Sequence, residues 1–105
     1  MTESPSHKRA KSRAAGPKGR TEVPLKGGQR LDAKSPGRAT EIERSGLPEL
    51  LVEAALRLKR SGAPQKVLQV PQKDMSEAVK AMKIQGIGGT VKNMGGTKSA
   101  HVRKK

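Results

Sequence analysis

Residues 29–44 read QRLDAKSPGRATEIER, and this stretch decides the fold that the sequence predicts. Apolar and polar residues alternate on both sides of a Ser-Pro-Gly sequence at 35–37, which is typical of two antiparallel strands joined by a turn. With the turn centred on its Pro-Gly, Asp32 lies opposite Glu41. The two-residue period of a strand then places four charged side chains on one face of the hairpin: Arg30, Asp32, Glu41 and Glu43. The other face is the core side, with Leu31, Ala33, Thr40 and Ile42.

Asp32 and Glu41 are the informative acids of the hairpin. Like charges directly opposite each other destabilise a sheet, so this pair requires a compensating charge. A divalent cation, Mg²⁺ or Mn²⁺, would supply it, since Mg²⁺ prefers a few carboxylates and keeps several waters for a substrate phosphate. Such an ion polarises a phosphodiester and generates hydroxide. The alternative is a solvated surface network in which Arg30 and Lys34 bridge the two acids.

A helix is predicted after the hairpin, over residues 48–60. Pro48 suits the first turn of a helix, and Gly62 is a natural stop. The apolar residues recur at helical spacing and form one stripe: Leu47, Leu51, Ala54 and Leu58.

The remaining elements follow from shorter patterns. Residues 66–70 read as a buried strand, a second helix starts after Asp74 and ends at Gly86, and residues 87–94 offer a last strand. Residues 21–25 form a short strand or a lead-in to the hairpin. The order β-β-α-β-α-β predicts an α/β domain built on a small mixed β-sheet.

The two ends of the chain differ from this middle part. Low hydrophobicity and high positive charge predict a disordered basic N-terminal arm at 1–20 and a basic C-terminal tail at 95–105, which leaves a single α/β domain at 21–94. A domain of this size without aromatic residues buries little apolar surface, so we expect a homodimer.

Composition narrows the class of protein. The 105 residues include 23 Lys and Arg against 9 Asp and Glu, a net charge of +14, and no Cys, Phe, Trp or Tyr. Without Cys there is no disulfide or Cys-based metal site, and the two His lie near opposite ends, which disfavours His-based catalysis. No apolar stretch is long enough to span a membrane or to form a signal peptide, so we expect a cytoplasmic protein.

The positive charge predicts a polyanionic partner, because neutralising phosphates releases condensed counterions. Nucleic acid is favoured over a membrane surface, since the sequence lacks a basic amphipathic helix with large apolar residues. Two Gly-Gly-Thr sequences, at 88–90 and 95–97, are interpreted as turns, with contact to a nucleic-acid backbone as the alternative. The candidate nucleic-acid-binding residues are Lys8, Arg9, Lys11, Arg13, Arg30, Lys92, Lys98 and Arg103.

The sequence Gln-Arg-Leu-Asp32, eight residues, then Glu41-Ile-Glu43, on a hairpin followed by a helix and a strand, resembles the PD-(D/E)xK nuclease superfamily. The resemblance covers roughly residues 22–94 and implies a restriction-endonuclease-like core. It implies that Asp32 and Glu41 are metal ligands, and that Glu22 matches an additional acid of some members. Leu31 stands where the superfamily has Pro.

Glu43 stands where the superfamily usually has the catalytic Lys, although some restriction enzymes carry Glu there. In this interpretation Glu43 assists through a bound water or supplies a ligand, and Lys66 polarises the attacking water.

Two functions therefore follow from the sequence. The first is a small Mg²⁺- or Mn²⁺-dependent endonuclease that hydrolyses phosphodiester bonds, acts on DNA more than RNA, and would be nucleoid-associated. The second is a non-catalytic, chromatin- or ribosome-associated nucleic-acid-binding protein in which the acids form structural ion pairs.

Overall fold

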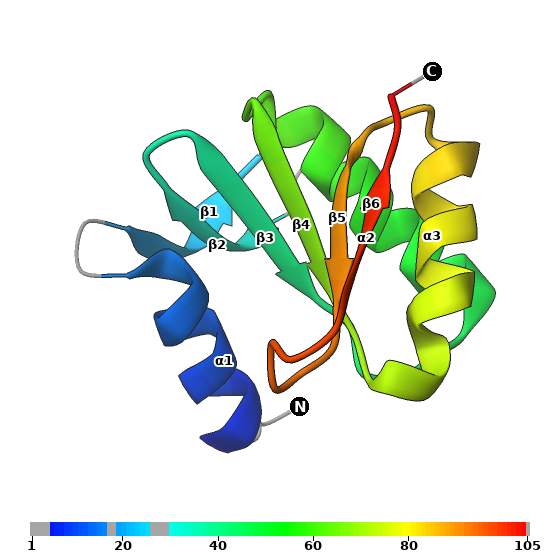
Figure 1. The fold of residues 1–105 in the computed structure, drawn as a ribbon. Helices are drawn as coiled ribbons and strands as arrows, with labels where there is room; N and C mark the ends of the chain where they lie inside the picture. The colour runs from blue at the N-terminus through cyan, green and yellow to red at the C-terminus, as the bar shows by residue number, and fades with distance from the viewer. Residues whose placement is uncertain (1–4, 17–18, 26–29, 105) are drawn as a thin grey trace.

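Six strands form one mixed sheet in which each strand lies beside its neighbours in sequence (Figure 1). The computed structural model describes residues 5–16, 19–25 and 30–104. The elements in these ranges are α1 (Pro5–Ala15), β1 (Arg20–Pro24), β2 (Arg30–Ser35), β3 (Arg38–Ile42), α2 (Pro48–Ser61), β4 (Gln65–Gln69), the short 3-10 helix η1 (Gln72–Asp74), α3 (Met75–Ile84), β5 (Gly89–Lys92) and β6 (Ser99–Val102).

The predicted hairpin is confirmed with its register. β2 and β3 are antiparallel, and Ser35 pairs with Arg38 and Ala33 with Thr40. Gly37 carries the turn with a φ of +79°, a value that favours glycine. The residues expected on the core side of the hairpin are at most 3% exposed: Leu31, Ala33, Thr40 and Ile42. Glu41, which was expected on the opposite face, is buried as well, at 1% exposed, so burial does not follow the predicted alternation in β3.

Two parallel crossovers follow the hairpin and complete a mixed α/β fold. β3, β4 and β5 are parallel, and α2 and α3 connect them. α2 begins at Pro48 and is closed by Gly62, whose φ of +69° gives the left-handed cap that ends many helices. Figure 1 shows α2 and α3 on the side of the sheet opposite α1.

The main core lies between the sheet and the two crossover helices. Its largest fully buried apolar side chains come from β2, α2, β4 and α3: Leu31, Leu51, Leu58, Leu68 and Met82. Gly89 starts β5 within this packing, where a Cβ atom would lie 2.2 Å from the carbonyl oxygen of Lys66. The Gly-Gly pair at 88–89 therefore permits close approach of two backbones instead of forming a flexible turn.

The N-terminal region differs from the disordered arm that the sequence predicts for residues 1–20. Within it, α1 packs on β1, β2 and β3, and Arg20 already belongs to β1. The contact is made by small side chains, because Ala10 and Ala15 are buried. Alanine contributes little to hydrophobicity but allows a helix to approach a sheet closely. The low mean hydropathy of this segment therefore does not reveal the face of α1 that packs on the sheet.

The C-terminal region differs in the same way from the expected tail at 95–105. β6 pairs antiparallel with β5 over Ser99–Val102, and Val102 is 1% exposed. Two small apolar residues in a basic stretch, Ala100 and Val102, are too weak a signal to predict a strand, and β6 forms because it pairs with β5. In the described ranges, no helix is both long and apolar enough to cross a membrane.

Candidate functional site

The two central acids of the hairpin, Asp32 and Glu41, lie on facing positions and are called the carboxyl pair here. Each carboxyl group accepts a backbone hydrogen bond from the opposite strand. The Asp32 N–H donates to Oε1 of Glu41 at 2.9 Å, and the Ile42 N–H donates to Oδ2 of Asp32 at 2.8 Å. The predicted juxtaposition of the two acids is therefore confirmed, and side chains bridge the strands where the ladder ends.

The prediction that both acids emerge on one face of the hairpin is wrong, because helices on opposite sides of the sheet contact them: α1 contacts Asp32 and α2 contacts Glu41 (Figure 1). Nε of Arg57, on α2, donates to Oε2 of Glu41 at 2.9 Å, and the Glu41 side chain is 1% exposed. On α1, Nε2 of His7 lies 3.8 Å from Oδ1 of Asp32, whose side chain is 17% exposed. Asp32 is thus the member of the pair that solvent reaches. Among the described residues, His7 and Arg57 contact the two acids, whereas the surface-network alternative places Arg30 and Lys34 there; the His7 contact is an ion pair only when the imidazole is protonated.

Burial shifts both acids toward the protonated form. Desolvation by burial and the nearby Asp32 charge raise the pKa of Glu41 to about 8, against the lowering effect of Arg57. Desolvation also raises the pKa of Asp32, although the Ile42 hydrogen bond and the charges of His7 and Lys11 oppose it. Titratable groups with strongly perturbed pKa values concentrate at functional sites.

Lys11 brings a buried cation to the same side of the sheet as Asp32. Its side chain is 4% exposed, and Nζ lies 2.6 Å from Oε1 of Glu22 on β1. Glu22 has a φ of +52°, in the left-handed region that costs a residue with a side chain of order 1–3 kcal/mol. A strained backbone thus presents the Glu22 carboxylate to Lys11, as at many functional sites.

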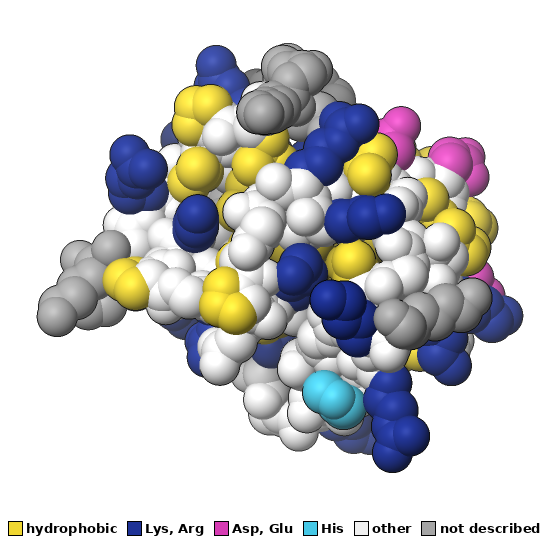
Figure 2. Space-filling model, turned by 90° about the horizontal axis from the view of Figure 1, so that it is seen from above, with side chains coloured by type: hydrophobic (Ala, Val, Ile, Leu, Met, Phe, Trp, Pro, Cys, Tyr) yellow, Lys and Arg dark blue, Asp and Glu magenta, His cyan; other side chains and the backbone are white. Residues whose placement is uncertain are grey.

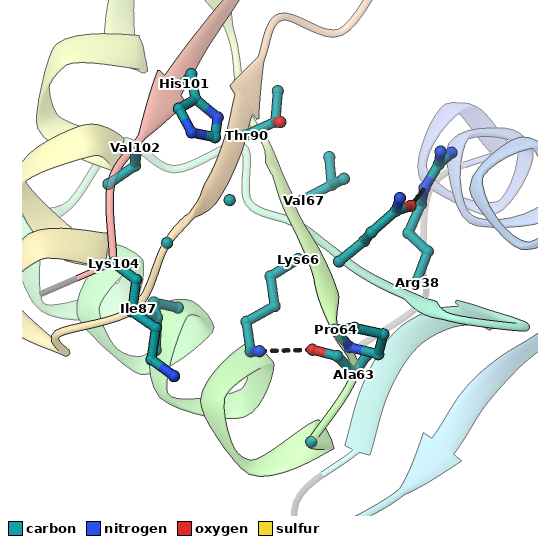
Figure 3. Close-up of a pocket in the computed structure, with 14 residues that line it drawn as sticks. Arg38, Ala63, Pro64, Lys66, Val67, Ile87, Thr90, His101, Val102 and Lys104 are labelled. Atoms are coloured by element: carbon teal, nitrogen blue, oxygen red, sulfur yellow. Dashed lines mark hydrogen bonds between the residues drawn. The ribbon is translucent and has the colours of Figure 1, made fainter.

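Three of the predicted site residues do not reach the carboxyl pair. Oε1 of Glu43 accepts the Ser45 N–H at 3.0 Å, so this carboxylate turns toward its own loop. Lys66 donates to the carbonyl oxygen of Ala63, and Figure 3 shows its side chain in a different hollow. Arg30 is exposed at the start of β2.

The sequence does not predict the positions of three residues near the carboxyl pair: His7, Lys11 and Arg57. The sequence predicts that both His7 and Lys11 lie in a disordered arm, with Lys11 as a nucleic-acid contact. The helical spacing of Ala10, Ala14 and Ala15 is the signal that could have placed them on a docked helix. Arg57 gives no local signal, because its contact with Glu41 spans 16 residues.

The other proposed nucleic-acid contacts are mostly on the surface. Lys8, Arg9, Arg13, Lys98 and Arg103 are exposed, while Lys92 is half-buried. Figure 2 shows Lys and Arg side chains across the end of the molecule that it views, with the visible Asp and Glu side chains toward one edge.

The carboxyl pair could hold a hydrated Mg²⁺ ion but offers few ligands. In the described part of the chain, no group of three or more His, Cys, Asp or Glu side chains could hold a metal ion. Mg²⁺ is usually bound through one or two carboxylates and keeps several waters, so two carboxyl groups fit its chemistry. Comparison of the chain with protein-family models, curated proteins and solved structures gives no match in any of the three.

Proposed function

We propose that this protein is a Mg²⁺- or Mn²⁺-dependent nuclease-like protein that binds DNA and hydrolyses its phosphodiester bonds. The carboxyl pair is the observation that carries the proposal. Desolvation by burial raises the pKa of both carboxyl groups, and the Asp32 charge adds to the rise at Glu41, so ionising both is unfavourable. A divalent cation offsets this cost, and the net charge of +14 favours a polyanionic substrate.

In this function Asp32 and Glu41 would hold the metal ion, with Asp32 as the solvent-accessible ligand. The chemistry that such an ion would supply there is polarisation of the scissile phosphate and a lower pKa for an attacking water. Lys11 takes the part that the sequence assigned to Lys66, because it is the lysine whose charge acts on Asp32. Glu22 positions Lys11 through their contact.

The arrangement of elements supports a restriction-endonuclease-like core. The acids lie on the hairpin β2–β3, α2 crosses over, and β4 returns parallel to β3. This is the order that the resemblance to the PD-(D/E)xK superfamily implies. A nucleoid-associated cytoplasmic location and a homodimer remain predictions.

The second candidate is a non-catalytic nucleic-acid-binding protein, chromatin- or ribosome-associated. Two contacts favour it: Arg57 holds one oxygen of Glu41, and Glu43 is turned toward Ser45. In that case the carboxyl pair joins the strands to α2 and takes no part in chemistry.

Titration with Mg²⁺ and Mn²⁺, followed by NMR, separates the two candidates. The amides of Asp32 and Ile42 donate directly to the two carboxyl groups, so they report metal binding with localised shifts. A plasmid-cleavage assay then compares the wild type with Asp32→Asn, which keeps an oxygen to accept the Ile42 N–H. The exposed acid Glu53 on α2 gives the matched control Glu53→Gln.

The nuclease proposal requires localised shifts and cleavage that Asp32→Asn abolishes and Glu53→Gln retains. Absence of both shifts and cleavage in a folded protein would leave the non-catalytic candidate.

A further inference from the structure

One half of a sheet face is open beside α1. This helix packs on β1, β2 and β3. Figure 1 shows no helix over β4, β5 and β6 on the same side among the described residues. The open half therefore forms a surface bounded by α1 on one side.

Two hollows occupy this surface and meet at Arg38. The larger has a volume of about 730 Å³ and is shown in Figure 3, and the smaller has a volume of about 160 Å³. Val67 and Thr90 line the larger hollow, while Gln69 and Lys92 line the smaller. Residues two apart on a strand point to the same face, so the two floors are continuous along β4 and β5. We call the joined hollows the cationic groove.

The groove is lined by positive charge without carboxylates. Its cations are Arg13, Arg38, Lys66, Lys92 and Lys104, and no Asp or Glu of the described residues lines either hollow. Within the part of the chain that the structure describes, the hydrogen-bond partner of the Arg38 side chain is a neutral group, since Nε donates to Oε1 of Gln65 at 3.3 Å. In the described ranges, Arg13 and Lys92 form no ion pair. Like charges that converge without acids are unfavourable unless an anion joins them.

We propose that the cationic groove binds the phosphodiester backbone of a nucleic-acid strand, with Arg38 at its centre. Arg38 and Thr40 of β3 line the groove, whereas Glu41, the next residue, is not among the lining residues and contacts Arg57 of α2. The proposal rests on the proposed function only for the nature of the partner, since it requires neither metal binding nor cleavage.

The chemistry of the groove favours recognition of phosphates over bases. The chain has no aromatic side chain on which a base could stack. Polar neighbours of the cations, such as Thr40 and Gln69, can donate to phosphate oxygens. Binding is therefore expected to vary little with base sequence and to weaken steeply with salt. A lipid surface fits less well, because the charge lies in a concavity instead of on a protruding apolar helix.

The test measures binding of a labelled oligonucleotide by fluorescence anisotropy, in EDTA, over a series of salt concentrations. The double variant Arg38→Gln/Lys92→Gln removes two charges from the groove. Lys73→Gln/Lys83→Gln removes two exposed charges from η1 and α3 and is the matched control. Circular dichroism confirms that both variants are folded.

The groove variant is expected to bind at least about tenfold more weakly and to reduce the slope of log K against log salt by about 2, one per lost phosphate contact. The control should show a clearly smaller change in both. Equal losses in the two variants would overturn the proposal, because they would show attraction to the overall charge alone.

Two further probes distinguish the source of the phosphate. Inorganic phosphate and vesicles containing phosphatidylserine are titrated against the same variants. If the groove variant loses binding to either of these while oligonucleotide binding is unchanged, the groove does not hold a nucleic-acid strand. Because EDTA is present throughout, a failed metal titration leaves this proposal intact, and a failed binding test leaves the metal site intact.

Discussion

Glu41 makes the stability of this protein depend on pH in an unusual direction. Its pKa is raised from 4.5 to about 8 in the folded state. Between these values the folded protein keeps a proton that the unfolded chain has released, so the free energy of unfolding falls as pH rises from about 4.5 to about 8. Each pKa unit corresponds to about 1.36 kcal/mol, which sets an upper limit of about 5 kcal/mol on this loss.

Glu41→Gln removes this titration and keeps a side chain of the same shape. Near pH 5 the variant should be close to the wild type in stability, because the wild-type carboxyl is then protonated. Near pH 8 the variant should be more stable by several kcal/mol, up to the same limit of about 5 kcal/mol. Urea denaturation followed by far-UV circular dichroism across this pH range, in EDTA, measures the difference between the two profiles.

The comparison cancels the contribution of the groups that both proteins share. Asp32→Asn tests the same reasoning in a second way. Removing the Asp32 charge should lower the pKa of Glu41, so the loss of stability should end at a lower pH than in the wild type. Parallel pH profiles for the wild type and Glu41→Gln would refute the reasoning. They would mean that the Arg57 contact outweighs burial and keeps Glu41 ionised.

Three other predictions test the site and the packing. Affinity for Mg²⁺ should rise about tenfold per pH unit below pH 8, because the ion must displace a proton from the carboxyl pair. Calorimetry in buffers of different ionisation enthalpy measures the number of protons released on binding. An affinity that does not change with pH would contradict this prediction. Lys11→Met should reduce Mg²⁺-dependent cleavage by at least about tenfold, whereas Lys83→Met, at an exposed position of α3, should leave it unchanged. Equal rates for the two variants would remove Lys11 from the mechanism. Gly89→Ala should lower the free energy of unfolding by about 2 kcal/mol or more, because the new Cβ overlaps a backbone oxygen. Gly95→Ala should change that free energy by less than about 0.5 kcal/mol, because no other atom lies within 4 Å of the new Cβ. Similar urea midpoints for the two alanine variants would contradict the close packing inferred at β5.

The sequence could predict where the backbone places the two acids of the site, but not which side chains surround them. The facing positions of Asp32 and Glu41 follow from a turn and a two-residue period, both of which are local. Their surroundings do not follow, because the partners come from distant elements. The sequence suggested Lys66 as the missing lysine, while the folded chain turns Lys66 to Ala63 and brings Lys11 toward Asp32.

The sequence by itself determined the hairpin, its register and α2. These depend on patterns within about fifteen residues: the alternation around the turn at 35–37, the proline that starts α2 and the glycine that closes it. Tertiary structure alone decided that α1 docks on the sheet and that Glu41 is buried. The docking of α1 rests on alanine contacts that carry little hydrophobicity in sequence, and Glu41 becomes buried because α2 packs over β3 and carries Arg57 to it.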